Sequence, residues 1–233
     1  MTEAAPELLN RIAADWSSCT ACRLHLVRTN VVALEDCRDD PARPVVLVVG
    51  EAPGKTEDET GRPFHPDTPA GALLRRILEQ AGVLSNCVIT GCIACRPTGD
   101  VDPQADEIAA CRPRLAAILA ATSPVATVSV GRLAKEQIAI AFPHARKKSL
   151  LAGVPTVHVV HPASWLRANQ SSDLVDQRVR VAAKAVTRLV EKIDLAPRGV
   201  EGCREHRWRS VGWWTRDTKP VRPLEQCPCG QIR

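Results

Sequence analysis

Four short runs of apolar, mostly β-branched residues constrain the fold of this chain more than any other feature. They cover residues 45–49, 88–90, 127–130 and 157–160. The apolar residues in each run are continuous, which is typical of strands buried on both faces of a sheet. Segments with helical spacing separate the runs, so parallel crossover connections are expected. The pattern predicts an α/β fold, a three-layer sandwich in which helices flank a small central parallel four-stranded sheet.

The helices are predicted from apolar residues that recur every three or four positions. We expect them at residues 6–16, 69–81, 105–121, 132–141 and 176–193. After residue 196 this periodicity stops, and Pro, Gly, Trp and Arg dominate the sequence. The change of texture predicts two domains: an α/β domain over residues 1–196 and a small C-terminal module over residues 197–233.

Composition narrows the class of protein. Hydrophobic residues make up 45% of the chain and charged residues 24%, and no apolar run is long enough to cross a bilayer. The N-terminus also lacks the pattern of a secretory leader, so we expect a cytoplasmic protein with no membrane partner. From residue 197 onward, eight Arg or Lys residues face four Asp or Glu, which places +4 of the net charge of +5 in the tail. Such a tail is compatible with a polyanionic partner and equally with solubility alone.

The loops that follow the four predicted strands are where a ligand is expected. In an open parallel sheet, ligands bind outside the carboxyl ends of the strands. The loops in question are residues 50–54, residues 91–99, Gly131 and residues 161–163. Because these loops meet at one rim of the sheet, the chemistry should lie there.

The ten cysteines suggest a metal centre, because thiols in a reducing compartment bind metals more often than they form disulfides. Cys19 and Cys22 form a C-x2-C pair, and Cys95 and Cys111 are two further candidates. Four thiolates can hold a 4Fe-4S cluster. They can equally hold zinc, for which Cys92 and Cys95 supply a second C-x2-C pair. Buried thiols without a metal are a third reading, and the spacing leaves all three open.

Several segments, in this order, resemble the family 4 uracil-DNA glycosylases, prokaryotic enzymes with a 4Fe-4S cluster. The resemblance covers residues 8–193. The matching pieces are Cys19-Thr-Ala-Cys22, Thr29-Asn-Val-Val32, Gly50-Glu-Ala-Pro-Gly54, Gly61-Arg-Pro-Phe64, Cys95-Arg-Pro97, Gly131-Arg-Leu-Ala134 and His161-Pro-Ala163. The resemblance implies Cys19, Cys22, Cys95 and Cys111 as cluster ligands, with Cys87 and Cys92 as buried filler.

The resemblance implies a DNA glycosylase of base excision repair. Such an enzyme flips a uracil or another altered base out of DNA and hydrolyses its N-glycosidic bond, because the bond is shielded inside the stack. The alternative is a catalytically weak DNA-binding protein of the same superfamily that recognises modified bases. DNA is the expected partner, and a monomeric protein of prokaryotic or phage type is expected.

Each matched position carries an expected role. Glu51 matches the family's catalytic acid, which stabilises the cationic sugar and orients water. His161 would donate a hydrogen bond to the leaving base. Phe64 would stack on the base, and backbone groups at Gly50 and Ala52 would line its pocket. The following pair, Leu166 and Arg167, would fill the gap in the DNA and bind phosphate.

Two positions depart from the family, and both lie in the expected base pocket. Gly91 stands where the family has an Asn that reads the edge of uracil, and Asp100 stands where it has a second Asn. A glycine has no side-chain donor or acceptor, so uracil cannot be read there as in the family. The enzyme accepts a different or larger base in the vacated space, has relaxed selectivity, or has lost catalysis while retaining DNA binding.

The C-terminal module contains two pairs of potential zinc ligands, Cys203 with His206 and Cys227 with Cys229. Two short-spaced pairs can close a tetrahedral structural site. A loosely ordered tail is the other reading. The family resemblance does not extend to these residues.

Overall fold

The computed structural model describes residues 5–140, 154–168, 170–191, 193–195, 209–216 and 219–226. Within these residues the main sheet has five strands in the order β1-β3-β2-β4-β5. They are β1 (Glu35–Asp36), β2 (Val46–Gly50), β3 (Cys87–Gly91), β4 (Ala126–Val130) and β5 (Thr156–Val159). The last four are parallel, as the sequence predicts, and β1 adds a short antiparallel edge that the sequence did not reveal.

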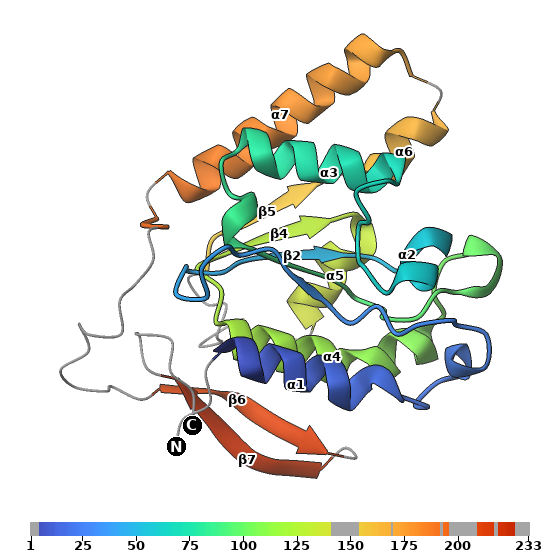
Figure 1. Cartoon of the computed structure of the whole chain (residues 1–233), viewed down its shortest axis with the longest axis vertical. Coiled ribbons are helices and arrows are strands. Elements are labelled where there is room, and N and C mark those ends of the chain that lie inside the picture. The colour runs from blue at the N-terminus through green and yellow to red at the C-terminus, as the bar shows by residue number, and fades with distance from the viewer. Residues whose placement is uncertain are drawn as a thin grey trace.

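Helices cover both faces of this sheet, which confirms the three-layer sandwich (Figure 1). One face carries α1 (Ala5–Ser17), α4 (Ala105–Thr122) and α5 (Arg132–Ile140). The other carries α3 (Pro69–Gln80), α6 (Pro162–Arg167) and α7 (Ser172–Val190). The remaining helical elements are short: α2 (Lys55–Thr60), η1 (Arg23–Leu26), η2 (Leu84–Asn86) and η3 (Thr98–Asp100). None of the described helices is long and apolar enough to cross a membrane.

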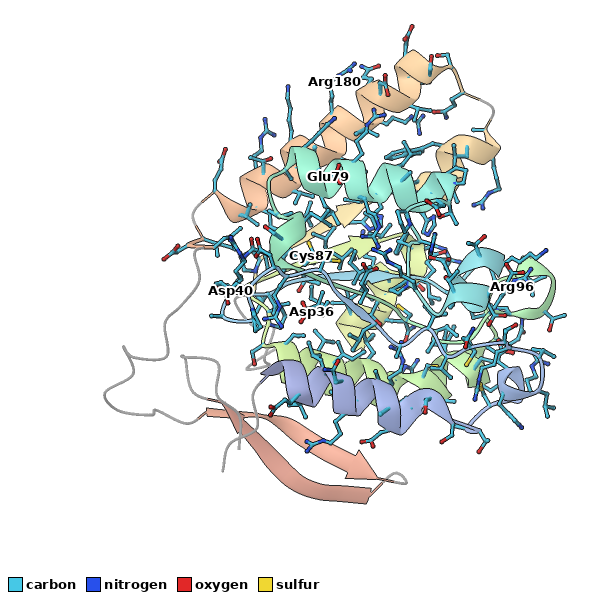
Figure 2. All side chains as sticks on the ribbon, viewed as in Figure 1. Asp36, Asp40, Glu79, Cys87, Arg96 and Arg180 are labelled. Atoms are coloured by element: carbon cyan, nitrogen blue, oxygen red, sulfur yellow. The ribbon has the colours of Figure 1, made fainter. Side chains whose placement is uncertain are left out.

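Alternation along the central strand explains the two cores. Leu47 and Val49 of β2 point into the core under α1 and α4, whereas Val46 and Val48 point into the core under α3 and α7. All four are fully buried, as expected for a strand with helices on both faces. Figure 2 shows the side chains between the layers, with Cys87 at the sheet and the exposed Glu79 and Arg180 on the outer helices.

The fourth predicted strand is less buried than its sequence indicates. In β5, Thr156 and His158 are exposed and Val157 is partly buried, so only Val159 lies in the core. The prediction of a strand buried on both faces was therefore wrong for β5. Its position at the end of the strand order explains the difference, because an edge strand is paired along one side only.

The described part of the C-terminal module is an antiparallel hairpin of β6 (Arg209–Arg216) and β7 (Lys219–Gln226). The zinc site predicted for this module cannot be placed, because its four residues lie outside the described residues. They are Cys203, His206, Cys227 and Cys229.

Candidate active site

The residues at the carboxyl ends of the parallel strands meet at one rim, as the topology predicts. Glu51 follows β2 directly, Gly91 ends β3, Gly131 follows β4 and His161 lies two residues after β5. A Cβ atom added to Gly131 would come within 2.7 Å of Glu51 Cδ, so the ends of β2 and β4 lie side by side. The rings of Phe64 and His161 are 5.6 Å apart between centroids, tilted by 32°. The structure thus brings together the predicted acid, aromatic and histidine.

Glu51 is held by the first turn of α5. Its Oε1 accepts a hydrogen bond of 3.1 Å from the backbone N–H of Leu133. This contact with an N–H group in the first turn of the helix orients the carboxylate. Gly131 lies against the same carboxylate with a φ of 92°, a backbone conformation that favours glycine. The absence of a side chain at Gly131 is what lets Glu51 lie there.

Both backbone polar groups of Phe64, its N–H and its carbonyl, form hydrogen bonds to side chains. Its N–H donates to a carboxylate oxygen of Glu57, and its carbonyl accepts a 3.0 Å hydrogen bond from Arg75 Nε. Arg75 is itself paired with Glu35 at 2.5 Å. The ring lies against Gly50, where a Cβ would come within 2.7 Å of Phe64 Cζ. The φ of Phe64 is 45°, so these contacts hold a non-glycine residue in the left-handed region.

Glu57 joins the aromatic residue to the acid-bearing loop. While one oxygen accepts from Phe64, the other accepts a 2.6 Å hydrogen bond from the N–H of Gly54. Burial raises the pKa of Glu57, and the two backbone N–H donors oppose that rise. No role was predicted for Glu57. Its position three residues after Gly54 is the signal that was available, since this is the spacing of a capping box.

His161 caps the N-terminus of α6 and lies among buried groups. Its Nδ1 accepts a hydrogen bond of 3.3 Å from the N–H of Ala163. Burial lowers the pKa of His161; the charge of Glu51 opposes this fall and Arg167 adds to it. At neutral pH the imidazole is therefore neutral. Because Nδ1 is an acceptor, the network assigns the single ring proton to Nε2, which is free to act as a donor.

A small cavity of about 10 Å³ lies beside Glu51 and Phe64, and His161 is not among the residues that line it. It has room for about one water molecule. The residues that line it are Val32, Gly50, Glu51, Ala52, Pro53, Glu57, Pro63, Phe64, Gly91 and Ile93. The cavity thus includes the predicted pocket residues Gly50, Ala52, Phe64 and Gly91, and its lining side chains include no hydrogen-bond donor.

Backbone atoms already occupy the space in which a side chain at position 91 would begin. A Cβ atom at this position would come within 2.7 Å of the carbonyl oxygen of Ile93 and 3.2 Å of that of Glu51. The N–H groups of Cys92 and Ile93 donate to the carbonyls of Gly50 and Glu51, both at 3.0 Å. The backbone of this turn therefore occupies the place where a side chain from position 91 would start. That a larger base enters the space beyond Gly91 stays a prediction.

Other predicted contact residues lie around the rim. Leu166 is 41% exposed at the end of α6, and the neighbouring Arg167 is exposed. Asp100 lies at the end of η3, and its side chain is outside the described part of the structure. No role was predicted for Asp58. Its carboxylate accepts hydrogen bonds from the N–H groups of Thr29 and Asn30 and so joins the loop that contains these two residues to α2.

The four cysteines of the resemblance come from three segments of the chain. Cys19 and Cys22 lie between α1 and η1, Cys95 follows β3, and Cys111 is on α4. Their thiols are close enough for charges on them to interact. Burial raises the pKa of Cys95 to about 11, and Arg28, whose NH1 lies 3.4 Å from Cys95 Sγ, opposes this rise.

The remaining cysteines of the core have a different environment. Cys87 and Cys92 are buried, and burial raises the pKa of Cys92 to about 12. Such thiols behave as small apolar side chains, which is what the sequence analysis expected of both. Within the described residues, no group of three or more His, Cys, Asp or Glu side chains is arranged around a single metal position.

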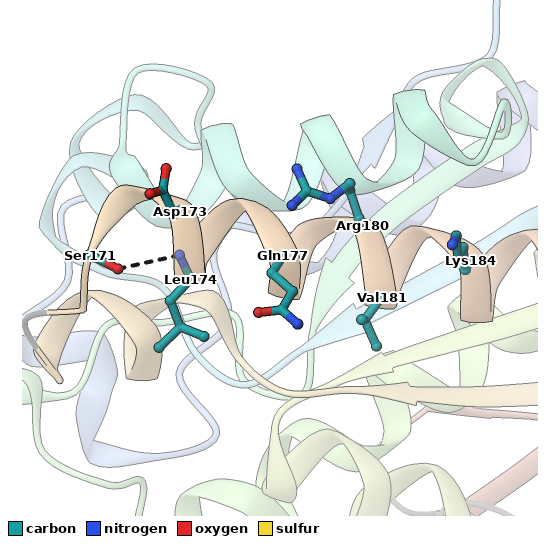
Figure 3. Close-up of a pocket in the computed structure, with 7 residues that line it drawn as sticks. All are labelled: Ser171, Asp173, Leu174, Gln177, Arg180, Val181 and Lys184. Atoms are coloured by element: carbon teal, nitrogen blue, oxygen red, sulfur yellow. Dashed lines mark hydrogen bonds between the residues drawn. The ribbon is translucent and has the colours of Figure 1, made fainter.

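A wider surface hollow of about 670 Å³ runs along α7 (Figure 3). Its lining side chains come from α7 and its N-cap residue, and they include neither the acid Glu51 nor the aromatic Phe64 that line the small cavity. The residues are Ser171, Asp173, Leu174, Gln177, Arg180, Val181 and Lys184. Because it lacks the converging groups that catalysis needs, the small cavity at the rim is the better candidate despite its size.

Comparison with known proteins points to the same rim. A model of the uracil DNA glycosylase superfamily matches residues 38–185, a range that includes Glu51, Phe64 and His161. A type-4 uracil-DNA glycosylase of Thermotoga maritima is 34% identical over 175 residues, which cover 72% of this chain and 88% of the relative. Type-4 uracil-DNA glycosylases of Sulfurisphaera tokodaii and Saccharolobus solfataricus are 36% and 35% identical over 126 residues. Those two alignments cover 53% of this chain and only 54% and 56% of the relatives.

Proposed function

This chain belongs to the uracil-DNA glycosylase superfamily, and from that premise we propose that it is a DNA glycosylase acting on uracil or another altered base. The observation that supports the proposal most directly is that Glu51 and Phe64 line one small cavity and that the ring of His161 lies 5.6 Å from the ring of Phe64. An acid, a stacking aromatic and a neutral donor are the groups that cleavage of an N-glycosidic bond requires.

The reaction follows from the placement of these groups. A flipped base stacks on Phe64, and His161 Nε2–H donates to the base oxygen on which negative charge collects as the bond to C1′ breaks. The Glu51 carboxylate faces the cationic sugar and accepts a proton from the water that attacks C1′. The products are the free base, which takes up a proton from solvent, and an abasic site in the DNA.

Entry of the base requires the cavity to open. Its volume of about 10 Å³ is far below that of a pyrimidine ring, so DNA binding must displace Phe64 or the adjoining loop. We propose that Leu166 enters the gap left in the duplex and that Arg167 binds a phosphate, since both are exposed at the end of α6.

The cysteine set fits an iron–sulfur cluster. The donors are thiols alone, two of them are buried, and Cys22, Cys95 and Cys111 pack into or against the same core. We propose that Cys19, Cys22, Cys95 and Cys111 hold a 4Fe-4S cluster, which would supply a covalent link between the N-terminal loop, the β3 loop and α4. The protein's own residues perform the hydrolysis.

The test uses oligonucleotides that contain a single uracil or hypoxanthine. The purified protein is incubated with each in single- and double-stranded form, and alkali-labile abasic sites are quantified. Glu51→Ala and His161→Ala should each slow release strongly, by about 10² or more. Tight DNA binding without release of any base would overturn the glycosylase in favour of the binding protein.

A further inference from the structure

Arg114 on α4 is a fully buried cation, with 0% of its surface exposed. Within the described residues no carboxylate forms an ion pair with it. Its guanidinium instead donates to neutral oxygen atoms, and its Nε is buried without a hydrogen-bond partner. A buried charge without an opposite charge is costly, so the contacts that retain it must be specific.

The hydrogen bonds of Arg114 converge on the end of β3 and the loop beside it. NH1 donates to the carbonyl of Ala33 at 2.6 Å and to Thr90 Oγ1 at 2.9 Å. NH2 donates to the carbonyl of Gly91 and, at 3.5 Å, to that of Cys92. The planar fork of an arginine is suited to several acceptors at fixed angles, and a lysine could not satisfy all of them.

These contacts fix the turn at residues 91–93 from one side, while the acid-bearing loop fixes it from the other. The carbonyls of Gly91 and Cys92 face Arg114, and the N–H groups of Cys92 and Ile93 bond to the carbonyls of Gly50 and Glu51. Both N–H groups are therefore already used and cannot read a base. The clamped turn is also the reason that a side chain at position 91 would meet the Ile93 carbonyl.

We propose that Arg114 is a positioning residue that sets the base selectivity of the pocket by clamping the turn at residues 91–93. This inference rests on the proposed glycosylase function. In the clamped position Gly91 offers no side-chain donor, and the N–H groups of Cys92 and Ile93 are already bonded, so none of these groups discriminates among bases by the hydrogen bonds of their edges. Gly91 and Arg114 act as a pair: the arginine holds the turn where only glycine fits.

The first experiment measures how strongly the turn at residues 91–93 is protected from hydrogen exchange, and it does not require the protein to be active. Hydrogen exchange of the full-length protein is followed by mass spectrometry on peptides that contain residues 91–95, for the unmodified chain, Arg114→Lys and Arg114→Met. Loss of charged hydrogen bonds to the two carbonyls should speed exchange there by about tenfold or more. Arg112→Met is the matched control, since Arg112 lies on the same helix but donates to Gln137 at 2.9 Å.

The second experiment measures selectivity. The ratio of single-turnover release rates for uracil and hypoxanthine is compared among the same variants. A changed ratio of about fivefold or more in Arg114→Lys, with Arg112→Met unchanged, supports the proposal. Arg114→Lys keeps the positive charge, so the measurement is made on this variant alone if Arg114→Met does not fold. Equal slowing on both bases with unchanged exchange at residues 91–95 would overturn it.

The double variant Gly91→Asn/Arg114→Met tests the pairing of the two positions. Gly91→Asn alone should destabilise the protein, and releasing the clamp should relieve part of that loss, so the two effects are not additive. Strict additivity would contradict the pairing. If the unmodified protein releases no base, the glycosylase function fails, and the exchange measurement still decides whether Arg114 clamps the turn.

Discussion

Gly131→Ala tests where the carboxylate of Glu51, proposed as the catalytic acid, lies. The added Cβ would stand 2.7 Å from Glu51 Cδ, and ordinary contact begins near 3.4 Å, so the carboxylate must move by at least about 0.7 Å. A misplacement of about 1 Å in a catalytic group costs about 10² in rate. The movement also strains or breaks the hydrogen bond from the Leu133 N–H to Glu51. We therefore expect single-turnover release of the base to slow by about 10².

A second glycine separates this effect from backbone strain. Gly82 also has a positive φ, of 69°, but a Cβ added there meets nothing within 4 Å. Both Gly131→Ala and Gly82→Ala should lose about 1–2 kcal/mol of stability in thermal or urea unfolding, because alanine tolerates this backbone poorly. Only Gly131→Ala should lose activity per folded molecule. A normal rate for Gly131→Ala would refute the assignment of Glu51 at this contact.

Four further predictions concern single groups. Burial lowers the pKa of His161 in the folded protein. As the pH falls below about 6.5, His161 therefore takes up a proton in the unfolded chain before it does so in the folded protein, and the folded state loses stability. The melting temperature should drop between pH 7 and pH 5 more steeply in the unmodified protein than in His161→Asn. Glu57→Gln leaves the N–H of Gly54 or Phe64 without a carboxylate acceptor and should cost about 1–3 kcal/mol in urea unfolding, with a slower rate of base release; unchanged values would mean that Glu57 does not position Phe64. Cys95→Ser should reduce the iron bound per chain, measured by elemental analysis, whereas Cys92→Ala should retain it. Leu166→Ala should slow base release from double-stranded DNA more than from single-stranded DNA, and equal slowing on both would argue against a wedge.

The sequence predicted the layers of the fold because each rests on a local pattern. The four parallel strands and the five longer helices were all expected within a few residues of their bounds. Two helices were missed, α2 and α6, and each has only six residues, which is too short to show helical periodicity. The strand β1 was missed because it consists of two acidic residues, Glu35 and Asp36, with no apolar signal.

The candidate site was predicted in part. Glu51, Phe64 and His161 were expected from the family resemblance, and the strand-end rule places Glu51 and His161 at one rim. The groups that hold them could not be read from the sequence, because their partners are distant in the chain. Arg114 contacts a carbonyl 81 positions away. One signal did exist: Arg114 interrupts an apolar stripe that includes Cys111 and Ile118, and a charge in such a stripe indicates a specific buried partner.

The strand order has a consequence for how the protein loses activity on heating. Glu51 follows β2, which is paired on both sides, whereas His161 follows the edge strand β5. Edge elements open with a smaller free energy than central ones, so partial opening would carry the histidine away while the acid stays in place. Loss of activity should then begin below the temperature of global unfolding. In molecules that have already lost activity, the backbone amides of β2 should still be protected from hydrogen exchange.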